Sequence, residues 1–480
     1  MAEVLPKVVV IGGGIAGLAA AAHLGGAAGG PARAAVTLLE AGERVGGKLL
    51  TGEVGGIQVD LGAESMLARR PESVELAREV GLADFLEPPS TAKAAVWTRG
   101  ALHPLPGGQL MGVPGDLAAL AASGVLTPEG LARAGAERPA EPWAVADRGG
   151  DTAIGAYVAE QVGQEVVDRL VEPLLGGVYA GRAEEISLRA AVPQLLAIAQ
   201  GGGSLVAGVH ALLDRPQAGG PVFQGLRGGI GTLPTAVAAA CERAGVELRL
   251  RTPVSALRRT ATGWQVVTAE GVIEADAVLL AVPAPAAAAL LAADAPAAAA
   301  ELADVEYAGM ALVTLAFRRA ELPSPPPGSG FLVPPVDGRS IKAATFSSQK
   351  WGWLERSAPE AFVLRTSLGR HRDEAALDLD DAELVTRSLT DLRAAVGLTA
   401  SPYASAVTRW RAGLPQYPVG HLDRVARIRE AARRLGALAL AGAAYDGVGI
   451  PACVASARRA ADELMTPQSG GPGMEGTMRA

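Results

Sequence analysis

The stretch VVVIGGGIAGLAAAAHL, residues 8–24, decides the fold of this chain of 480 residues. Its first four residues are apolar and mostly β-branched, which is typical of a parallel strand that is buried on both faces. The glycines that follow have the spacing Gly12-x-Gly14-x-x-Gly17 and lead into an alanine-rich helix. Gly12 permits a tight turn, Gly14 lets a pyrophosphate approach the backbone, and Gly17 lets the helix pack closely on the strand. The stretch therefore predicts the start of a dinucleotide-binding βαβ unit.

The second strand of this unit, residues 36–39, ends at Glu40, which lies 23 residues after Gly17. A carboxylate at this place accepts a hydrogen bond from a ribose hydroxyl. The helix that starts after the glycines offers free N–H groups and the positive end of its dipole to the phosphates. Strand, glycine turn, helix and acid together favour nucleotide binding over an ordinary turn in a glycine-rich chain.

Further glycine segments indicate a long dinucleotide that is held firmly. Residues 44–48, RVGGK, place an arginine and a lysine around a second glycine pair, and residues 59–64, VDLGAE, add another glycine for close approach. A strand at 437–441, a glycine loop and a helix at 451–464 again direct a helix N-terminus at the ligand, where it would stabilise negative charge on a reduced flavin. A mobile NAD has no need of such a clamp, so we interpret the segments as an FAD site.

Composition excludes several classes of protein. The chain is 49% hydrophobic and 19% charged, which is typical of a globular protein. A net charge of −7 and 4% aromatic residues argue against nucleic acid as a partner, because phosphate binding needs a basic surface. The two cysteines and five histidines show neither a disulfide framework nor the spacing of a metal site. The longest uncharged apolar run, between Asp276 and Asp294, is shorter than the roughly 20 residues of a spanning helix, so we expect a soluble, cytoplasmic protein.

Strands are also predicted at 246–250, 264–268, 275–282 and 361–368, and helices at 154–170 and 232–244. Dinucleotide-type elements thus occur at the start, in the middle and near the end of the chain, with other segments inserted between them. The predicted fold class is α/β, with a discontinuous Rossmann-like domain for FAD and inserts that build the substrate side of a cleft.

Longer segments carry a resemblance to a known family. The glycine stretch at the start, LLEAGERVGGK at 38–48 and VDLGAE at 59–64 are shared with amine oxidases and phytoene desaturases. More specific segments are, in order, GALHPLP at 100–106, EPLLGGVYAG at 172–181, EISLRAAVP at 185–193, LRGGIGTLP at 226–234, LPQYPVGH at 414–421 and AGAAYDGVGIPACVAS at 441–456. With these segments the chain resembles the flavin-dependent protoporphyrinogen and coproporphyrinogen III oxidase family. Its Ala-, Gly- and Arg-rich composition favours the coproporphyrinogen III oxidase type of Gram-positive bacteria.

The resemblance implies three parts and a disordered tail at 466–480. Residues 1–83, 215–300 and 405–465 would form the FAD-binding domain, 84–214 a helical lobe of the membrane-surface type, and 301–404 an inserted α+β substrate-binding domain. The cofactor-binding residues, read from the glycine segments and from the family motifs, are Gly12, Gly14, Gly17, Glu40, Arg44, Gly46, Gly47, Lys48, Gly62, Ala63, Val254, Gly442, Val448 and Ile450.

The resemblance also implies a tetrapyrrole substrate and O₂ as the electron acceptor, in haem biosynthesis. Oxidation of coproporphyrinogen III to coproporphyrin III removes six electrons and yields three H₂O₂, and protoporphyrinogen IX would be a secondary substrate. By position, Gly177, Leu332 and Ser367 would line the pocket beside the flavin. No acid–base constellation is needed, since the flavin carries the redox chemistry.

The sequence does not single out one group that would hold the propionate side chains of the tetrapyrrole. Some family members have an arginine after the LP segment for this purpose, but residues 107–111, GGQLM, contain no base. Basic candidates on the expected substrate side are Arg339, Lys342, Lys350, Arg365 and Arg370. Since carboxylates pair strongly with such cations, we expect one or two of them to bind substrate and the others to be solvated.

Two alternatives stay open. A flavin amine oxidase would share every FAD motif but would usually have a lysine near flavin N5, and this chain has lysine only at positions 7, 48, 93, 342 and 350. A non-catalytic flavin-binding protein would keep the pocket without turnover. The oligomeric state, the strength of any peripheral membrane contact and a hand-off of product to ferrochelatase are also left open by the sequence.

Overall fold

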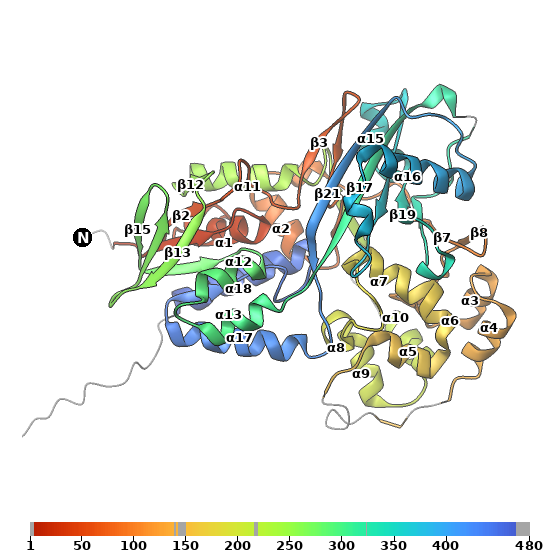
Figure 1. Cartoon of the computed structure of the whole chain (residues 1–480), viewed down its shortest axis with the longest axis horizontal. Helices are drawn as coiled ribbons and strands as arrows, with labels where there is room; N and C mark the ends of the chain where they lie inside the picture. The colour runs from red at the N-terminus through yellow and green to blue at the C-terminus, as the bar shows by residue number, and fades with distance from the viewer. Residues whose placement is uncertain (1–3, 139–140, 143–149, 216–218, 323, 467–480) are drawn as a thin grey trace, which may run out of the picture.

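The computed structural model describes residues 4–138, 141–142, 150–215, 219–322 and 324–466. The predicted tail at 466–480 lies outside these residues except for Thr466. The first sheet has five parallel strands in the order β12-β2-β1-β16-β22 (Figure 1). Their bounds are Lys7–Ile11 (β1), Ala35–Leu39 (β2), Glu247–Arg249 (β12), Ala277–Leu280 (β16) and Leu438–Leu440 (β22). The sheet thus joins distant parts of the chain, as predicted for a discontinuous Rossmann-like domain.

Both faces of this parallel sheet are covered, which explains why β1 is apolar at successive positions. Val8 and Val10 pack in one core with α1 (Ile15–Gly25), α2 (Glu72–Glu79), α11 (Thr232–Arg243) and α18 (Ile450–Met465). Val9 and Ile11 face a second core. This core is built by the antiparallel sheet β13 (Val254–Arg259), β14 (Trp264–Thr268) and β15 (Gly271–Ala275) and by α12 (Ala284–Leu291), α13 (Pro296–Ala303) and α17 (His421–Leu435).

A second, larger sheet has seven strands in the order β21-β17-β20-β19-β18-β7-β8, and its pairs are antiparallel except β18 with β7. The bounds are Ala404–Pro415 (β21), Tyr307–Arg318 (β17), Ala361–Leu368 (β20), Ile341–Thr345 (β19), Gly330–Leu332 (β18), Ala94–Thr98 (β7) and Ala101–Pro104 (β8).

The bounds of this sheet differ from the predicted substrate domain at 301–404. Strands β7 and β8 belong to the sheet although the sequence places them in the helical lobe, and almost all of β21 lies in the predicted FAD segment from 405. For β7 and β8 the reason is physical: strands of four or five residues show too little periodicity to reveal which sheet they join.

The two faces of the large sheet have different surroundings. On one face, Val313, Phe331 and Phe362 are buried in a core with α16 (Asp381–Val396). On the other face, five partly exposed residues follow one another from strand to strand in register: Thr408, Leu312, Ser367, Ala343 and Leu332. We call this row the open face of the sheet.

Helices α3 to α10 form a helical lobe that lies beside the large sheet (Figure 1). They are α3 (Leu117–Ser123), α4 (Pro128–Gly135), α5 (Ile154–Val162), α6 (Gln164–Val166), α7 (Glu172–Tyr179), α8 (Leu188–Ala191), α9 (Pro193–Gly201) and α10 (Leu205–Leu213). The single helix predicted at 154–170 is interrupted at Gly163, which has φ +101, and a π-helical turn (η2, Val167–Val171) leads into α7. A π-helical turn is frequent at functional sites, and this one sets the rotation of α7.

The remaining elements connect these layers. They are β3 (Thr51–Val54) with β4 (Ile57–Asp60), β9 (Gln109–Leu110) with β10 (Val113–Pro114), the sheet β5 (Met66–Leu67), β11 (Phe223–Leu226) and β6 (Leu86–Glu87), α14 (Ser347–Lys350), α15 (Gly352–Ser357), and the short 3₁₀ turns Ala83–Phe85, Arg319–Glu321, Pro335–Asp337 and Ala375–Asp378.

Candidate functional site

The two glycine loops predicted to hold the dinucleotide lie against each other. The N–H of Gly46 donates to the carbonyl oxygen of Gly13 at 2.8 Å, and Gly14 and Gly46 form a parallel bridge. A Cβ on Gly47 would lie 3.4 Å from the Cα of Gly14. The first turn of α1 and the second glycine pair therefore form one surface.

Each glycine of the first loop has a distinct reason to lack a side chain. Gly12 has φ +106, and a Cβ there would lie 2.6 Å from the carbonyl oxygen of Ala281. A Cβ on Gly17 would overlap the carbonyl oxygen of Gly12. Gly14 is different, since nothing in the protein lies within 4 Å of the Cβ position. It caps α1 without a side-chain hydrogen bond, so it faces open space at a helix N-terminus.

Glu40 ties the two loops together. Its Oε2 accepts the N–H of Gly13 at 2.7 Å, and its Oε1 accepts the N–H of Gly42 at 2.7 Å. A ribose hydroxyl can still bind, because each carboxylate oxygen accepts more than one hydrogen bond. The sequence predicted the contact with ribose but not this bracing of the backbone.

Two cations of the second loop lack carboxylate partners among the described residues. Arg44 donates to the carbonyl oxygens of Val45 at 3.0 Å and Gly47 at 2.6 Å. Lys48 is largely buried with its Nζ 5.6 Å from the centre of the Tyr307 ring, and burial lowers the pKa of its ammonium. Unpaired cations beside an open glycine turn suit a pyrophosphate and an electron-rich flavin.

The third predicted segment completes the same region. Gly442, at the end of β22, has φ +121 and donates its N–H to Ser456 Oγ at 3.1 Å. Helix α18 starts at Ile450 after Gly449, which supplies no side-chain cap, and α18 packs along α1. Val448 packs against the core of the helical lobe. The N-termini of α1 and α18 thus stand side by side, and both present free N–H groups.

Two predicted cofactor residues have a less specific setting. Val254 begins β13 and packs on the second core, and Ala63 is exposed. Gly62 is more informative, because a Cβ there would overlap the carbonyl oxygen of Lys48. The VDLGAE segment is therefore packed directly on the RVGGK segment.

Glu64, which the sequence analysis did not single out, holds this segment to the large sheet. Its carboxylate is buried and pairs with Lys350 Nζ at 2.5 Å and Arg365 Nε at 3.2 Å. Burial opposes its charge, but Arg365 and Lys350 outweigh burial and hold the pKa of the carboxyl below its ordinary value. Arg365 also donates to the carbonyl oxygen of Gly62 at 2.7 Å. In the sequence, the signal for this role of Glu64 was its place as the acid that ends the VDLGAE segment.

Lys350 and Arg365 were predicted as ligands of substrate carboxylates, and the ion pairs give them another role. Both are paired with the carboxylate of Glu64, which supplies one negative charge to the two of them, so they join the FAD side to the substrate sheet. Arg339 has a different place: its guanidinium lies 4.5 Å from the centre of the Trp97 ring, which belongs to the core on the other face of the sheet. All three cations already have partners within the protein, so none of them is a free partner for an anion on the open face.

Glu64→Gln should lower the free energy of unfolding by about 3–5 kcal/mol, because it leaves two cations buried without a counter-charge. Chemical denaturation of the purified protein measures this change. Glu355→Gln is the matched control, since Glu355 is half exposed and its pair with Arg319 at 3.5 Å is worth less than about 1 kcal/mol. Equal, small changes in both variants would contradict the role given to Glu64.

The residues predicted to line the substrate pocket come together. Leu332 and Ser367 belong to the row of the open face, on either side of Ala343. Gly177, in α7, is exposed, and a Cβ there would lie 3.7 Å from Leu332 Cδ2. Val178 beside it is 42% exposed although it is apolar. The exposed side of α7 thus lies close to the open face of the sheet, where Leu312, Ala343 and Leu332 offer apolar surface to a flat ligand.

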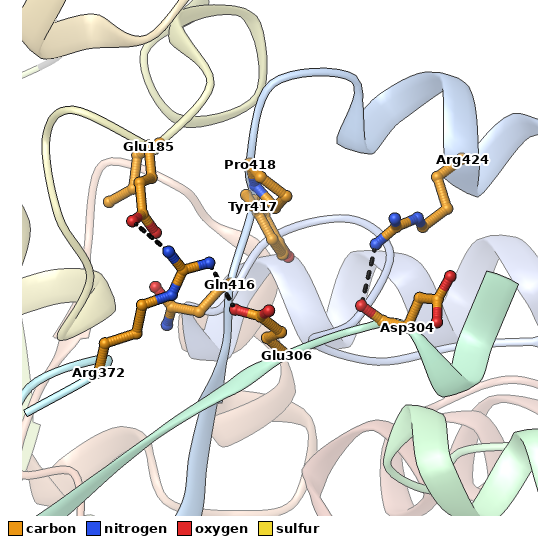
Figure 2. A pocket seen from close by; sticks show the side chains of 9 residues that line it. Glu185, Asp304, Glu306, Arg372, Gln416, Tyr417, Pro418 and Arg424 are labelled. Atoms are coloured by element: carbon orange, nitrogen blue, oxygen red, sulfur yellow. Dashed lines mark hydrogen bonds and ion pairs between the residues drawn. The ribbon is translucent and has the colours of Figure 1, made fainter. Parts of the chain in front are cut away.

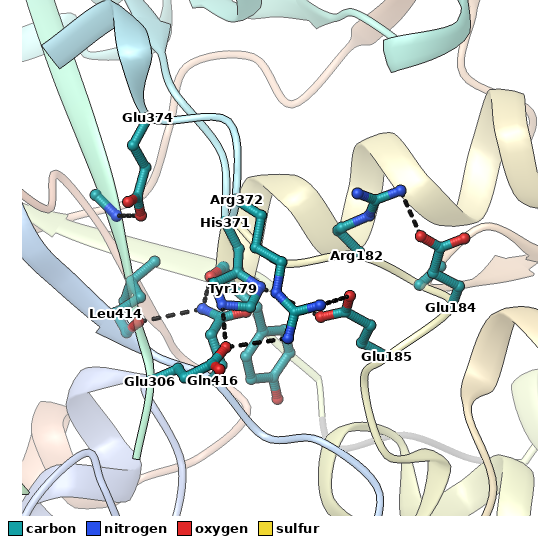
Figure 3. Close-up of polar contacts among 12 residues, drawn as sticks. Tyr179, Arg182, Glu184, Glu185, Glu306, His371, Arg372, Glu374, Leu414 and Gln416 are labelled. Atoms are coloured by element: carbon teal, nitrogen blue, oxygen red, sulfur yellow. Dashed lines mark hydrogen bonds and ion pairs between the residues drawn. The ribbon is translucent and has the colours of Figure 1, made fainter. Parts of the chain in front are cut away.

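A polar cluster fixes the end of α7 that carries these residues (Figures 2 and 3). Arg372 pairs with Glu185 at 2.9 Å and with Glu306 at 3.4 Å, and the buried His371 lies 2.7 Å from Glu306. The backbone N–H of His371 donates to the carbonyl oxygen of Ala180 at 2.8 Å, just after α7.

The same cluster borders a pocket of about 120 Å³. Its lining combines three acids, two arginines and four further residues: Glu185, Asp304, Glu306, Arg372, Arg424, Ile186, Gln416, Tyr417 and Pro418 (Figure 2). Gln416 donates to the carbonyl oxygen of Tyr179 at 2.9 Å, and the Tyr417 hydroxyl donates to that of Ala443, in the loop before α18. The cluster links the helical lobe to both sheets and keeps α7 in place.

The described part of the chain has neither a candidate metal site nor a candidate membrane-spanning helix. No three His, Cys, Asp or Glu side chains there are grouped so that they could hold a metal ion. No helix there has both the length and the apolar character needed to cross a membrane.

Comparisons with known proteins agree with this site. Residues 15–465 match the model of the family of flavin-containing amine oxidoreductases. The chain is 38% identical to a coproporphyrinogen III oxidase of Mycobacterium leprae, over 95% of this chain and 97% of the relative. It is 32% identical to a coproporphyrinogen III oxidase of Bacillus subtilis, over 97% and 99%. A crystal structure from Exiguobacterium sp., provisionally assigned as a protoporphyrinogen oxidase, has TM-score 0.83 and 35% identity, over 96% of this chain and 98% of that one.

The matches extend over nearly the whole chain. They confirm the predicted resemblance and FAD as the cofactor. The chain belongs to the family of flavin-containing amine oxidoreductases, in the branch that contains these coproporphyrinogen III oxidases.

Proposed function

We propose that this chain oxidises coproporphyrinogen III to coproporphyrin III, with FAD as cofactor and O₂ as acceptor, and that protoporphyrinogen IX is a secondary substrate. The observation that carries the proposal is the pairing of an FAD clamp with the exposed surface of α7 beside the open face of the large sheet. The names of the relatives from Mycobacterium leprae and Bacillus subtilis support the choice of a porphyrinogen.

The groups of the chain have separate tasks in this proposal. The glycine loops, Glu40, Arg44 and Lys48 hold the dinucleotide, and Glu64 fixes its loop to the sheet. Bound FAD supplies the two-electron redox chemistry. Gly177, Leu332 and Ser367 hold the macrocycle flat and exclude water. One methylene bridge of the macrocycle at a time then faces the flavin.

Proton transfer needs no dedicated residue at the reacting carbon. A pyrrole N–H becomes acidic once the adjacent bridge is oxidised, because loss of the proton restores conjugation. The chain therefore works by positioning and desolvation. A cytoplasmic location stays a prediction from the sequence, and contact of the helical lobe with a membrane surface and transfer of the product to ferrochelatase stay open.

Parallel assays with coproporphyrinogen III, protoporphyrinogen IX and a primary amine test the proposal. We expect porphyrin fluorescence to appear with both porphyrinogens, faster with coproporphyrinogen, and no peroxide with the amine. Oxidation of the amine without any porphyrin formation would instead favour an amine oxidase.

A further inference from the structure

Two cations near the open face of the large sheet have no anionic partner in the described part of the chain. Lys342 is 6% exposed, and its Nζ lies 4.0 Å from the sulfur of Met310. Arg370 donates to the carbonyl oxygen of Val333 at 2.8 Å and is in no ion pair within 4.0 Å. An unpaired buried ammonium costs several kcal/mol, so this arrangement is typical of a ligand site rather than of a core.

The backbone directs Lys342 toward the substrate side. The register of β19 on β20 shifts between Ile341 and Ala343, so that Lys342 is the extra residue of a β-bulge. Strand β20 lies between β19 and β17, and the Lys342 side chain therefore spans β20 to reach Met310. Met310 is two residues before Leu312 and points to the same face of the sheet. The amine thus lies on the open face.

The charges around the two cations come from three segments. Arg370 follows β20, Glu172 lies at the start of α7, and Asp373 lies beyond Arg370. Glu172 already accepts the N–H of Ala183 at 2.6 Å, and burial raises the pKa of its carboxyl. Glu172 and Asp373 thus lie near Arg370, whereas no carboxylate of the described residues forms an ion pair with Lys342.

We propose that Lys342 and Arg370 together bind one carboxylate of the tetrapyrrole. The proposal rests on the proposed function and narrows the five basic candidates to these two. A propionate beside Leu332 would bring its two oxygens to a point charge and a planar guanidinium, which bind carboxylates in different geometries. The two cations would then take the role of the arginine that residues 107–111 lack.

Proton uptake follows from the surroundings of the amine. Burial, together with the positive charge of Arg370, lowers the pKa of Lys342 to about 7. Below pH 7 the amine is already charged and binding is independent of pH. Above pH 7 a proton must be taken up, so the affinity should fall by about tenfold per pH unit.

The experiment measures binding of coproporphyrin III, the oxidised product, to the holoenzyme by fluorescence between pH 6 and 9. This readout does not depend on turnover. Lys342→Met should weaken binding by roughly tenfold or more at pH 6, whereas Lys342→Arg should keep the affinity and remove its pH dependence. Arg370→Met should weaken binding at every pH. Lys93→Met, at an exposed lysine before β7, is the control and should change nothing.

Kinetics distinguish failure of this subsite from failure of the proposed function. KM for coproporphyrinogen III should rise in Lys342→Met more than KM for protoporphyrinogen IX, which has two propionates instead of four, while the flavin spectrum is unchanged. Unchanged binding in both Lys342→Met and Arg370→Met, or a pH dependence that persists in Lys342→Arg, would overturn the subsite. A wild-type protein that binds coproporphyrin but oxidises neither porphyrinogen would overturn the proposed function alone.

Discussion

Gly14→Val is expected to give a folded protein that is purified without FAD. The backbone at residue 14 has φ −69 and ψ 177, an extended conformation that valine adopts readily. Since no protein atom lies within 4 Å of the Cβ position, the new side chain meets no obstacle inside the chain. It would instead occupy the space that a pyrophosphate needs at the N-terminus of α1. The flavin absorbance per protein should fall to nearly zero.

A matched control separates loss of ligand from loss of fold. Gly30 also has no neighbour within 4 Å of its Cβ position, lies in an exposed loop after α1 and has no positive φ, so Gly30→Val should retain full flavin. Circular dichroism of Gly14→Val should match that of FAD-free wild type, and that of Gly30→Val should match FAD-loaded wild type. Flavin content in Gly14→Val equal to that of wild type would show that the dinucleotide does not lie against this turn.

Gly177→Phe is expected to retain FAD and to lose porphyrinogen oxidation by about 100-fold or more, because a blocked or displaced substrate misses its reacting geometry. The residue is in α7, where a side chain is compatible with the helix. Its Cβ would be in ordinary contact with Leu332 Cδ2 at 3.7 Å, and the phenyl ring would then fill the gap above the open face of the sheet.

Size is the variable to control in this second experiment. Gly177→Ala adds only the methyl group that the structure accommodates, so it should keep most of the activity and all of the flavin. Steady-state rates with coproporphyrinogen III, referred to flavin content, give the comparison. Equal rates in the two variants would mean that the macrocycle binds elsewhere.

The FAD side of the molecule was predictable because its signals are local. Residues 8–24 contain a buried strand, a glycine turn and a helix in immediate succession, and Gly12 and Gly17 each have a steric reason in the structure. The buried row Val8 to Ile11 likewise follows from a sheet that is covered on both faces. Such features need no knowledge of distant parts of the chain.

The substrate side depends on contacts that sequence spacing does not contain. Whether Lys350 and Arg365 are free or paired depends on Glu64, about 300 residues away in the chain. The direction of Lys342 depends on a β-bulge, and the position of Gly177 on a π-helical turn before α7. The short strands β7 and β8 carried too few residues to indicate their sheet. These outcomes are set by tertiary packing, which overrides local pattern.

The central claim is tested most directly by aerobic incubation of the purified yellow protein with coproporphyrinogen III, with coproporphyrin and H₂O₂ measured in the same sample. Removal of six electrons in three two-electron steps, with O₂ as acceptor, predicts three H₂O₂ for each coproporphyrin formed, and catalase should remove the peroxide signal without changing the porphyrin. Porphyrin formation no faster than in a protein-free control, or a peroxide yield near zero, would contradict the account.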